Sequence, residues 1–240
     1  MIDPRIIIVN ERMKNVKKIV AVSSGKGGVG KSIIASTLAL ELAKKRYRVG
    51  LFDLDFTGPS AHIILGIEGL QPKEEKGIIP PRTHGIRFMS ITYYSGDLAT
   101  PLRGADVSNA LIELLAITRW GKLDYLILDM PPGIGDATLD LIRLIKNITF
   151  LIVTTSSQLA FETVKKLVSL LKSQKVNVLG VVENMKMDKS TNIQRSTEEL
   201  GLEFITGIPY DPAIEEAIGG TDRLLRTSLA RKIDVIASRI

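Results

Sequence analysis

The residues Gly25, Gly30, Lys31 and Ser32 have the types and the spacing that bind a triphosphate. They satisfy the pattern G-x-x-x-x-G-K-[ST], in which backbone N–H groups and a helix N-terminus surround the phosphates and the Ser hydroxyl binds Mg²⁺. An apolar run with strand character precedes the pattern, and a segment with helical apolar spacing follows it. The sequence therefore predicts a nucleoside triphosphate site. The predicted nucleotide contacts in this segment are Gly25, Lys26, Gly27, Gly28, Val29, Gly30, Lys31, Ser32 and Ile33.

Carboxylates follow two further apolar runs. The run from Arg48 to Leu54 leads to Asp53 and Asp55, and a second run leads to Asp129. In an open parallel sheet, ligands bind beyond the carboxyl ends of the strands, so these side chains are expected beside the phosphate loop. Carboxylates avoid burial without a partner, which favours a functional role. Asp129 has the Walker B position, where a carboxylate holds Mg²⁺ directly or through a water.

The segment after Asp129 reads MPPGIGD and predicts a rigid turn. Gly133 and Gly135 are expected to leave their backbone N–H groups free to approach a γ-phosphate. A segment of that kind can sense whether the phosphate is present.

Strand-like and helix-like segments alternate along the 240 residues, which predicts an α/β fold with a mainly parallel sheet. We expect an N-terminal extension over residues 1–17, with an extended start and a short helix, and a single P-loop ATPase domain over residues 18–240. No apolar run reaches membrane-spanning length, and MIDPRIIIVNER lacks the pattern of a signal peptide. The expected location is the cytoplasm.

The motifs SSGKGGVGKS, DLDFTGPS, DMPPGIGDATL and VVENM, in this order, resemble those of the Mrp/ApbC-type iron–sulfur cluster carriers. This subfamily belongs to the MinD- and ParA-like ATPases, which have a deviant Walker A motif. The resemblance implies a P-loop NTPase with a MinD-like three-layer sandwich, in which helices cover both faces of a mainly parallel sheet. It also implies an ATP-dependent homodimer in which Lys26 reaches across the interface to the phosphates of the partner's nucleotide.

The hypothesis for the site is an ATPase with ATP, ADP and Mg²⁺ as ligands and with low turnover. Lys31 binds the β- and γ-phosphates, while Ser32 and, through water, Asp129 hold the metal. Asp55 orients the attacking water, and Asp53 supports the metal shell. The predicted catalytic residues are Lys26, Lys31, Asp55 and Asp129. By resemblance alone, Asn184 contacts the adenine and the turn containing Pro209 and Asp211 covers the other side of the ring.

The sequence departs from the family just after VENM. There the family usually has Cys-x-x-Cys, and the paired cysteines of a dimer are thought to hold a bridging cluster. This chain reads KMDKSTNIQ at that place and contains no cysteine. Iron–sulfur clusters are held chiefly by cysteine thiolates, so we expect no cysteine-ligated cluster. The expected partners are a second copy of the chain and a cysteine-bearing scaffold or target protein.

Two other classes of function stay open. The first is a MinD- or ParA-like positioning ATPase that binds a membrane or DNA as an ATP-bound dimer; the net charge of +6 and the pI near 9.4 suit such partners. Many of these charges read as ordinary helix surface, so membrane and DNA are the less favoured partners. The second is a metabolic phosphoryl-transfer enzyme, which is least favoured because no separate substrate pocket is marked.

The C-terminal segment TDRLLRTSLARKIDVIASRI predicts an amphipathic helix with arginines between its apolar positions. We expect this helix to pack on the sheet; the alternative is a helix that lies on anionic lipid. Its apolar positions are Leu225, Leu229, Ile233, Ile236 and Ile240.

Overall fold

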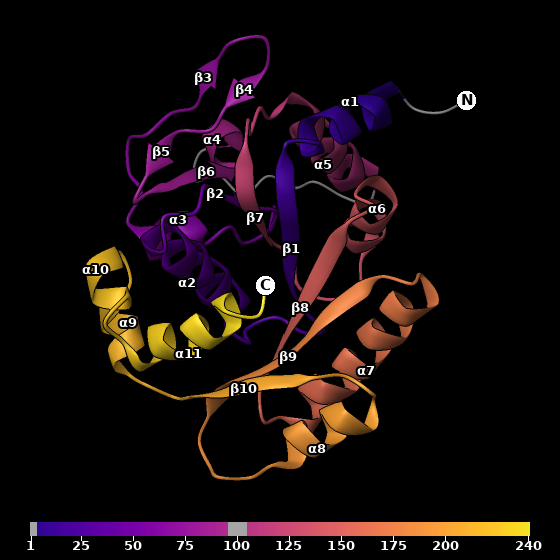
Figure 1. The fold of residues 1–240 in the computed structure, drawn as a ribbon, viewed down its shortest axis with the longest axis vertical. Coiled ribbons are helices and arrows are strands. Elements are labelled where there is room, and N and C mark those ends of the chain that lie inside the picture. Colours follow the sequence, from indigo (N-terminus) through magenta and orange to yellow (C-terminus); the bar gives the residue numbers. More distant parts are fainter. Residues whose placement is uncertain (1–3, 96–104) are drawn as a thin grey trace.

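A computed structural model describes residues 4–95 and 105–240. The chain forms a twisted eight-stranded sheet in the order β10-β9-β8-β1-β7-β2-β6-β5 (Figure 1). Neighbouring strands are parallel except β5, which runs antiparallel to β6. The strands are β1 (Val16–Ser24), β2 (Val49–Asp53), β5 (Arg82–Thr83), β6 (Ile86–Ser90), β7 (Leu123–Asp129), β8 (Ile148–Thr154), β9 (Asn177–Lys186) and β10 (Phe204–Pro209). The short strands β3 (Lys73–Glu74) and β4 (Ile78–Ile79) form a separate hairpin.

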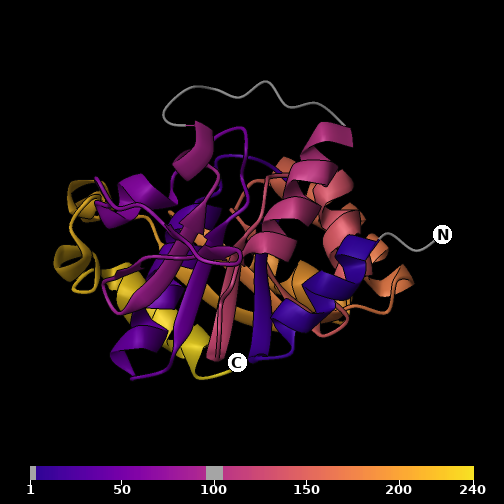
Figure 2. The ribbon, with the colours of Figure 1, turned by 90° about the horizontal axis from the view of Figure 1, so that it is seen from above.

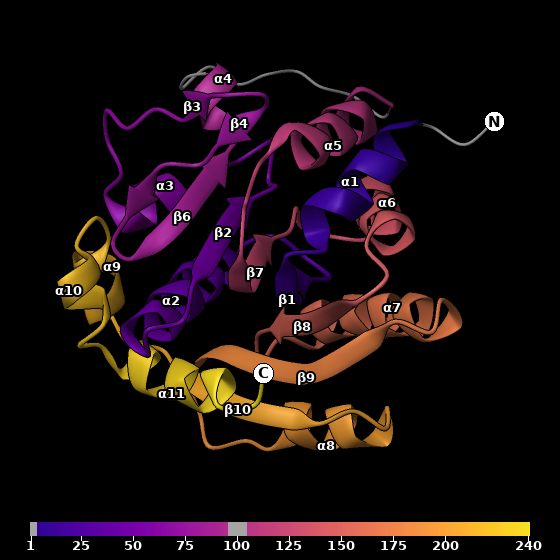
Figure 3. The ribbon, with the colours of Figure 1, turned by 45° about the horizontal axis from the view of Figure 1, so that its top comes forward.

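Helices cover both faces of this sheet, which gives three layers (Figures 2 and 3). One layer contains α2 (Lys31–Lys44), α3 (Ala61–Leu65), α9 (Ala213–Ala217), α10 (Thr221–Leu224) and α11 (Ser228–Ala237). The other contains α1 (Pro4–Met13), α5 (Ala105–Ile117), α6 (Asp136–Leu144), α7 (Gln158–Ser173) and α8 (Asn192–Glu199). The short helix α4 (Thr92–Ser95) follows β6. The predicted α/β architecture is confirmed.

The central strands read as continuous apolar runs because both of their faces are buried. Along β7, Ile127 points into the core beneath α2, while Leu126 and Leu128 point into the core beneath the opposite layer. Helix α2 is buried over most of its length because it lies between the sheet and α11. This burial fixes the helix whose first turn meets the phosphate loop.

The N-terminal helix α1 packs against α5, and its Val9 and Met13 belong to the main core. Strand β1 begins at Val16, ahead of the expected domain start at residue 18. Residues 1–3 lie outside the described part of the chain. The division into an extension and one domain stays a prediction, but α1 is packed as part of the same layered body.

The C-terminal segment differs from the single helix that its apolar spacing predicts. The helix is interrupted between α10 and α11. There the side chain of Thr227 accepts a hydrogen bond from Ala230 N and so caps α11. The apolar face of α11, with Leu229, Ile233 and Ile236, is buried on α2 and the sheet, as expected for a packed helix. Over residues 4–95 and 105–240, no helix has both the length and the hydropathy to cross a bilayer.

Candidate functional site

The phosphate loop joins β1 to α2 at the carboxyl edge of the sheet. Gly28 and Gly30 have φ values of 75° and 79°, a left-handed conformation that glycine adopts without a Cβ penalty. Lys31 is the first residue of α2, and no side chain caps this helix start. The first N–H groups of α2 are therefore available to an anion.

The loop is packed closely on two sides. A Cβ atom on Gly25 would lie 2.3 Å from Thr163 Oγ1 of α7, and one on Gly30 would lie 2.2 Å from Asn184 Nδ2 of β9. Asn184 Nδ2 also donates a hydrogen bond of 2.9 Å to the carbonyl oxygen of Val29. The glycines at the ends of the motif are thus required by neighbouring elements as well as by the ligand.

A buried ion pair lies beneath the loop. Lys31 Nζ is 2.5 Å from Asp129 Oδ1, and both side chains are almost completely buried. Burial raises the pKa of Asp129, and the charge of Lys31 opposes that rise. The pair joins the lysine of the phosphate loop directly to the Walker B carboxylate.

The residues around this pair fit a magnesium ion. Asp129 Oδ2 is buried and has no hydrogen-bond partner within the described residues, and Ser32 Oγ lies 3.2 Å from Lys31 Nζ. Mg²⁺ is usually held by one or two carboxylates or hydroxyls together with waters and substrate phosphates. The described residues contain no cluster of three or more His, Cys, Asp or Glu side chains that could hold a metal ion. A magnesium ion here would therefore take most of its ligands from phosphates and water.

Asp53 is fully buried at the end of β2. Its Oδ1 accepts a hydrogen bond from Asp55 N and its Oδ2 accepts one from Ala61 N, each at 3.1 Å. Burial and the nearby charge of Asp129 raise the pKa of Asp53 to about 8. Both oxygens are engaged with the backbone, so the side chain fixes the loop after β2 and the start of α3. This arrangement suits a residue that positions the groups around a metal ion without binding the ion directly.

Asp55 lies on the wall of the cavity above the phosphate loop. Its Oδ1 accepts hydrogen bonds from Thr57 Oγ1 at 2.8 Å and from Gly58 N at 3.1 Å. Its Oδ2 takes part in neither bond. The carboxylate is held in one orientation with one oxygen left for a ligand or a water.

The cavity has a volume of about 430 Å³. Its floor is the phosphate loop, residues 27–33, and its opposite wall is largely apolar. Sequence reasoning missed this wall because its residues come from four distant segments. Pro132 and Met185 belong to motifs, but nothing in the sequence marks the isoleucines of the other two segments as wall residues. The apolar wall contains Ile63 and Ile64 of α3, Pro132, Met185, Ile214 of α9 and Ile218 directly after α9.

The residues that the resemblance assigns to the adenine do not line the cavity described above. Asn184 is directed at Val29 of the phosphate loop. Pro209 and Asp211 are not among the residues that line the cavity. Asp211 accepts hydrogen bonds from Ser228 Oγ at 2.6 Å and from Ala213 N at 3.1 Å, so its side chain ties the turn after β10 to α11. Contacts of these residues with a base stay a prediction.

The turn after β7 corrects one expectation. Gly133 N is not free, because it donates a hydrogen bond of 2.9 Å to Ser24 O at the end of β1. Gly135 N has no acceptor within the described residues, as expected. The turn is thus tied to the phosphate loop through Gly133, and Gly135 is left to approach a phosphate.

Lys26, in the segment that leads into the phosphate loop, is exposed and forms no ion pair with any described residue. The backbone beneath it is fixed, because Ser24 Oγ donates a hydrogen bond of 2.9 Å to Lys26 O. A fixed backbone and a solvent-facing side chain suit a lysine that acts outside its own chain.

The loop between β9 and α8 occupies the place where the resemblance expects cysteines. Lys186 Nζ donates to Glu183 Oε2 at 2.8 Å and also to Ser190 O. Asp188 Oδ1 accepts a hydrogen bond of 2.9 Å from Ser190 N. Met187 is 82% exposed. The loop is closed by its own polar contacts and offers no thiolate.

Comparison with known proteins identifies the family of this chain. Residues 15–240 match the ParA family model described as NUBPL iron-transfer P-loop NTPase. An iron-sulfur cluster carrier protein of Pseudomonas fragi is 40% identical over 221 residues, covering 85% of this chain and 77% of the relative. One of Saccharolobus solfataricus is 38% identical over 226 residues, covering 87% and 76%.

Solved structures show the same architecture. A nucleotide-binding protein from Archaeoglobus fulgidus, in complex with ADP, has a TM-score of 0.77 and 31% identity, and the match covers 92% of this chain and 93% of that one. The cell division ATPase MinD of Pyrococcus furiosus has a TM-score of 0.68 at 18% identity, covering 93% and 98%, and so shares the fold.

Proposed function

Because this chain belongs to the ParA family of NUBPL-type iron-transfer P-loop NTPases, we propose that it is an ATP-dependent homodimeric switch in iron–sulfur cluster assembly or carriage. The observation that carries the proposal is the buried Lys31–Asp129 pair beneath an uncapped helix start. The cluster is then a cargo held by the cysteines of a partner, because this chain has none.

In the nucleotide site, the backbone N–H groups of residues 27–32 surround the phosphates. Lys31 leaves Asp129 and binds the β- and γ-phosphates, which frees the carboxylate. Ser32 and, through water, Asp129 would hold Mg²⁺, which neutralises phosphate charge when it is bound. Asp55 orients the attacking water with the oxygen that its turn leaves free.

Lys26 supplies the charge that a single chain lacks. In a face-to-face dimer its ammonium group reaches the partner's phosphates and stabilises the charge that develops during phosphoryl transfer. Hydrolysis therefore requires two copies of the chain, and turnover is low because it waits for dimer formation. The exposure of Lys26 next to the phosphate loop supports this role.

The partner binds at the edge where the phosphate loop and the β9–α8 loop meet. The phosphate loop follows β1 and the β9–α8 loop follows β9; these parallel strands both end at the carboxyl edge of the sheet. A dimer that closes over ATP changes the surface next to that loop. Nucleotide state can thus control whether a cysteine-bearing protein docks there.

Anaerobic transfer of a cluster from a cysteine-bearing scaffold to an apo-ferredoxin, followed by circular dichroism, tests the proposal. We expect the chain to accelerate transfer with MgATP and to bind no stoichiometric iron when it is purified alone. Lys31→Ala is the control that should remove the ATP effect. Stoichiometric iron on the isolated chain, or an acceleration that is the same with and without ATP, would contradict the proposal.

A further inference from the structure

Asn184 has a contact that a base-binding residue does not need. Its side chain is 4% exposed, and its Nδ2 donates 2.9 Å to the carbonyl oxygen of Val29, in the middle of the phosphate loop. Val29 is itself 4% exposed. A buried backbone carbonyl without a donor is costly, so this hydrogen bond decides which way the Val29 carbonyl points.

The next residue in the loop is fitted to the same side chain. Gly30 has φ 79°, and a Cβ there would lie 2.2 Å from Asn184 Nδ2. The carboxamide therefore fills the space behind Gly30 while it bonds to Val29. On its β9 side, the peptide between Val29 and Gly30 is thus both packed against Asn184 and hydrogen-bonded to it.

The strand end that carries Asn184 is rigid. Glu183 is 1% exposed, its Oε1 accepts from Ser156 Oγ at 2.9 Å, and its Oε2 accepts from Lys186 Nζ at 2.8 Å. Met185 has φ 54°, a left-handed conformation that is strained for a residue with a Cβ. Fixed neighbours on both sides prevent the carboxamide from following the loop if the loop moves.

From this geometry we infer that Asn184 is a positioning residue for the phosphate loop. In a trans peptide the C=O and the N–H point in opposite directions. By holding the Val29 carbonyl on the β9 side, Asn184 turns the Gly30 N–H toward the cavity and keeps a carbonyl dipole away from the triphosphate. The inference rests on the proposed nucleotide site and assigns it a residue that acts through the loop.

A positioning residue and a base contact differ in the ligands that they affect. Loss of a base contact weakens only ligands that carry a base. Loss of the Val29 hydrogen bond weakens every ligand that uses the loop, including inorganic tripolyphosphate. The comparison of MgATP with magnesium tripolyphosphate therefore separates the two roles.

Asn184→Asp keeps the shape of the side chain and removes the donor but adds a negative charge beside the phosphates, so Asn184→Ala, which adds no charge, is the deciding variant. By isothermal titration calorimetry on the full chain, we expect affinity for MgATP and for magnesium tripolyphosphate to fall by a similar factor, about tenfold. Asn184→Ala should act in the same direction. Unchanged tripolyphosphate affinity in both variants, with or without weaker ATP binding, overturns the inference.

The matched control is Asn177→Asp at the other end of the same strand, where Nδ2 donates to Thr149 Oγ1 at an exposed position. It should leave both affinities unchanged, and a loss like that of Asn184→Asp would show that the effect is not specific to the loop.

Amide hydrogen exchange without nucleotide gives a second readout. We expect the Gly30 and Lys31 amides to exchange faster in Asn184→Ala than in the parent, whereas a base contact predicts no change. Parent protein that binds neither ligand would contradict the proposed function, while the exchange result would still decide the role of Asn184.

Discussion

Lys31 has two partners in the proposed cycle, and the structure shows the first of them. Its ammonium group lies 2.5 Å from a carboxylate that water does not reach. Removing one member of a buried ion pair leaves the other member without compensation. The phosphate lysine is therefore also a determinant of stability in the nucleotide-free protein.

Lys31→Ala should abolish MgATP binding and lower the free energy of unfolding by about 3 kcal/mol. The double variant Lys31→Met with Asp129→Asn should recover most of that loss, because neither side chain is then charged, but it should not recover binding. Urea denaturation and titration calorimetry measure the two properties separately. A single variant as stable as the parent would show that the pair is not formed in solution.

Lys26→Ala should leave ATP binding nearly unchanged and reduce hydrolysis about 10³-fold, as expected for a charge donated to the transition state. The trans role has its own test. In a mixture of Lys26→Ala with Asp55→Ala chains, one site of each mixed dimer keeps its own Asp55 and receives Lys26 from the other chain. Phosphate release should therefore reappear on mixing. A mixture as inactive as its components would place Lys26 in the site of its own chain.

At the scale of elements, the starts of β1, β2 and β7 are tied together by Asp124. Its carboxylate accepts hydrogen bonds from Arg48 Nε at 3.0 Å and from Arg48 Nη2 at 2.9 Å, and Lys17 Nζ lies 2.9 Å away. The Arg48 side chain first, and then its backbone N–H and Lys17, hold the pKa of Asp124 well below its ordinary value of 3.8.

Asp124→Asn should accordingly lower stability at pH 7. A carboxylate whose pKa is lower in the folded state stabilises the fold above its unfolded pKa, and this contribution declines as the pH falls toward the folded pKa. The difference in urea midpoint between parent and variant should therefore be constant from pH 7 down to about 5 and shrink below about 4. A difference that grew on acidification would contradict this assignment.

Helix α11 tests the choice between a packed helix and a surface helix. Ile233 is fully buried against the layer that contains α2, whereas Val235 on the same helix is 40% exposed. Ile233→Ala should destabilise the protein by about 3 kcal/mol. Val235→Ala should change stability by less than about 0.5 kcal/mol. Equal effects from the two substitutions in thermal unfolding would argue that the helix is not docked in solution.

Local patterns were enough for the features that short stretches of chain encode. Apolar runs predicted the central strands within a few residues, and their carboxyl ends placed Asp53, Asp55 and Asp129 at one edge. The interruption of the helix at Thr227 was missed because helical apolar spacing continues across it. The spacing of apolar residues shows which positions face the core, but it does not show where a capping residue ends one helix and starts the next.

Contacts between distant segments could not be predicted in this way. The Gly133 N–H reaches Ser24, and Asn184 reaches Val29, only because parallel strands bring their carboxyl ends together. The apolar wall of Ile214 and Ile218 depends on where a short helix docks. Resemblance predicted an adenine contact for Asn184, which stays a prediction, and gave no sign of its observed partner Val29.

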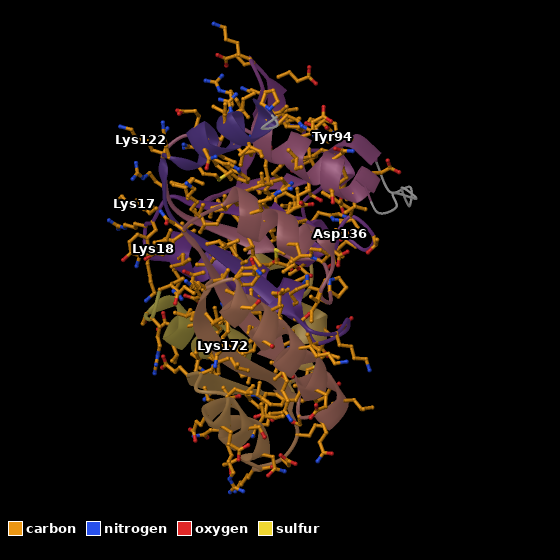
Figure 4. The ribbon with its side chains drawn as sticks, turned by 90° about the vertical axis from the view of Figure 1, so that its right-hand side faces the viewer. Lys17, Lys18, Tyr94, Lys122, Asp136 and Lys172 are labelled. Atoms are coloured by element: carbon orange, nitrogen blue, oxygen red, sulfur yellow. The ribbon has the colours of Figure 1, made fainter. Side chains whose placement is uncertain are left out.

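At the scale of the whole molecule, some of the lysines lie far from the nucleotide site. Figure 4 shows Lys17, Lys18 and Lys122 together at the amino edge, with Asp136 at the opposite edge, where the nucleotide site lies. The net charge of +6 is therefore not explained by the triphosphate alone. In the proposed site, binding of phosphate relies on backbone N–H groups and on Lys26 and Lys31.

The packing of α11 on α2 has a consequence for synthesis on the ribosome. Helix α2 is translated early, but the helix that covers its outer side is formed by residues 228–237. Until those residues leave the exit tunnel, the apolar side of α2 that α11 later covers is exposed to solvent. The cavity wall at residues 214–218 is also translated late, so the proposed nucleotide pocket is incomplete while translation proceeds, and a stalled chain would be a client for chaperones.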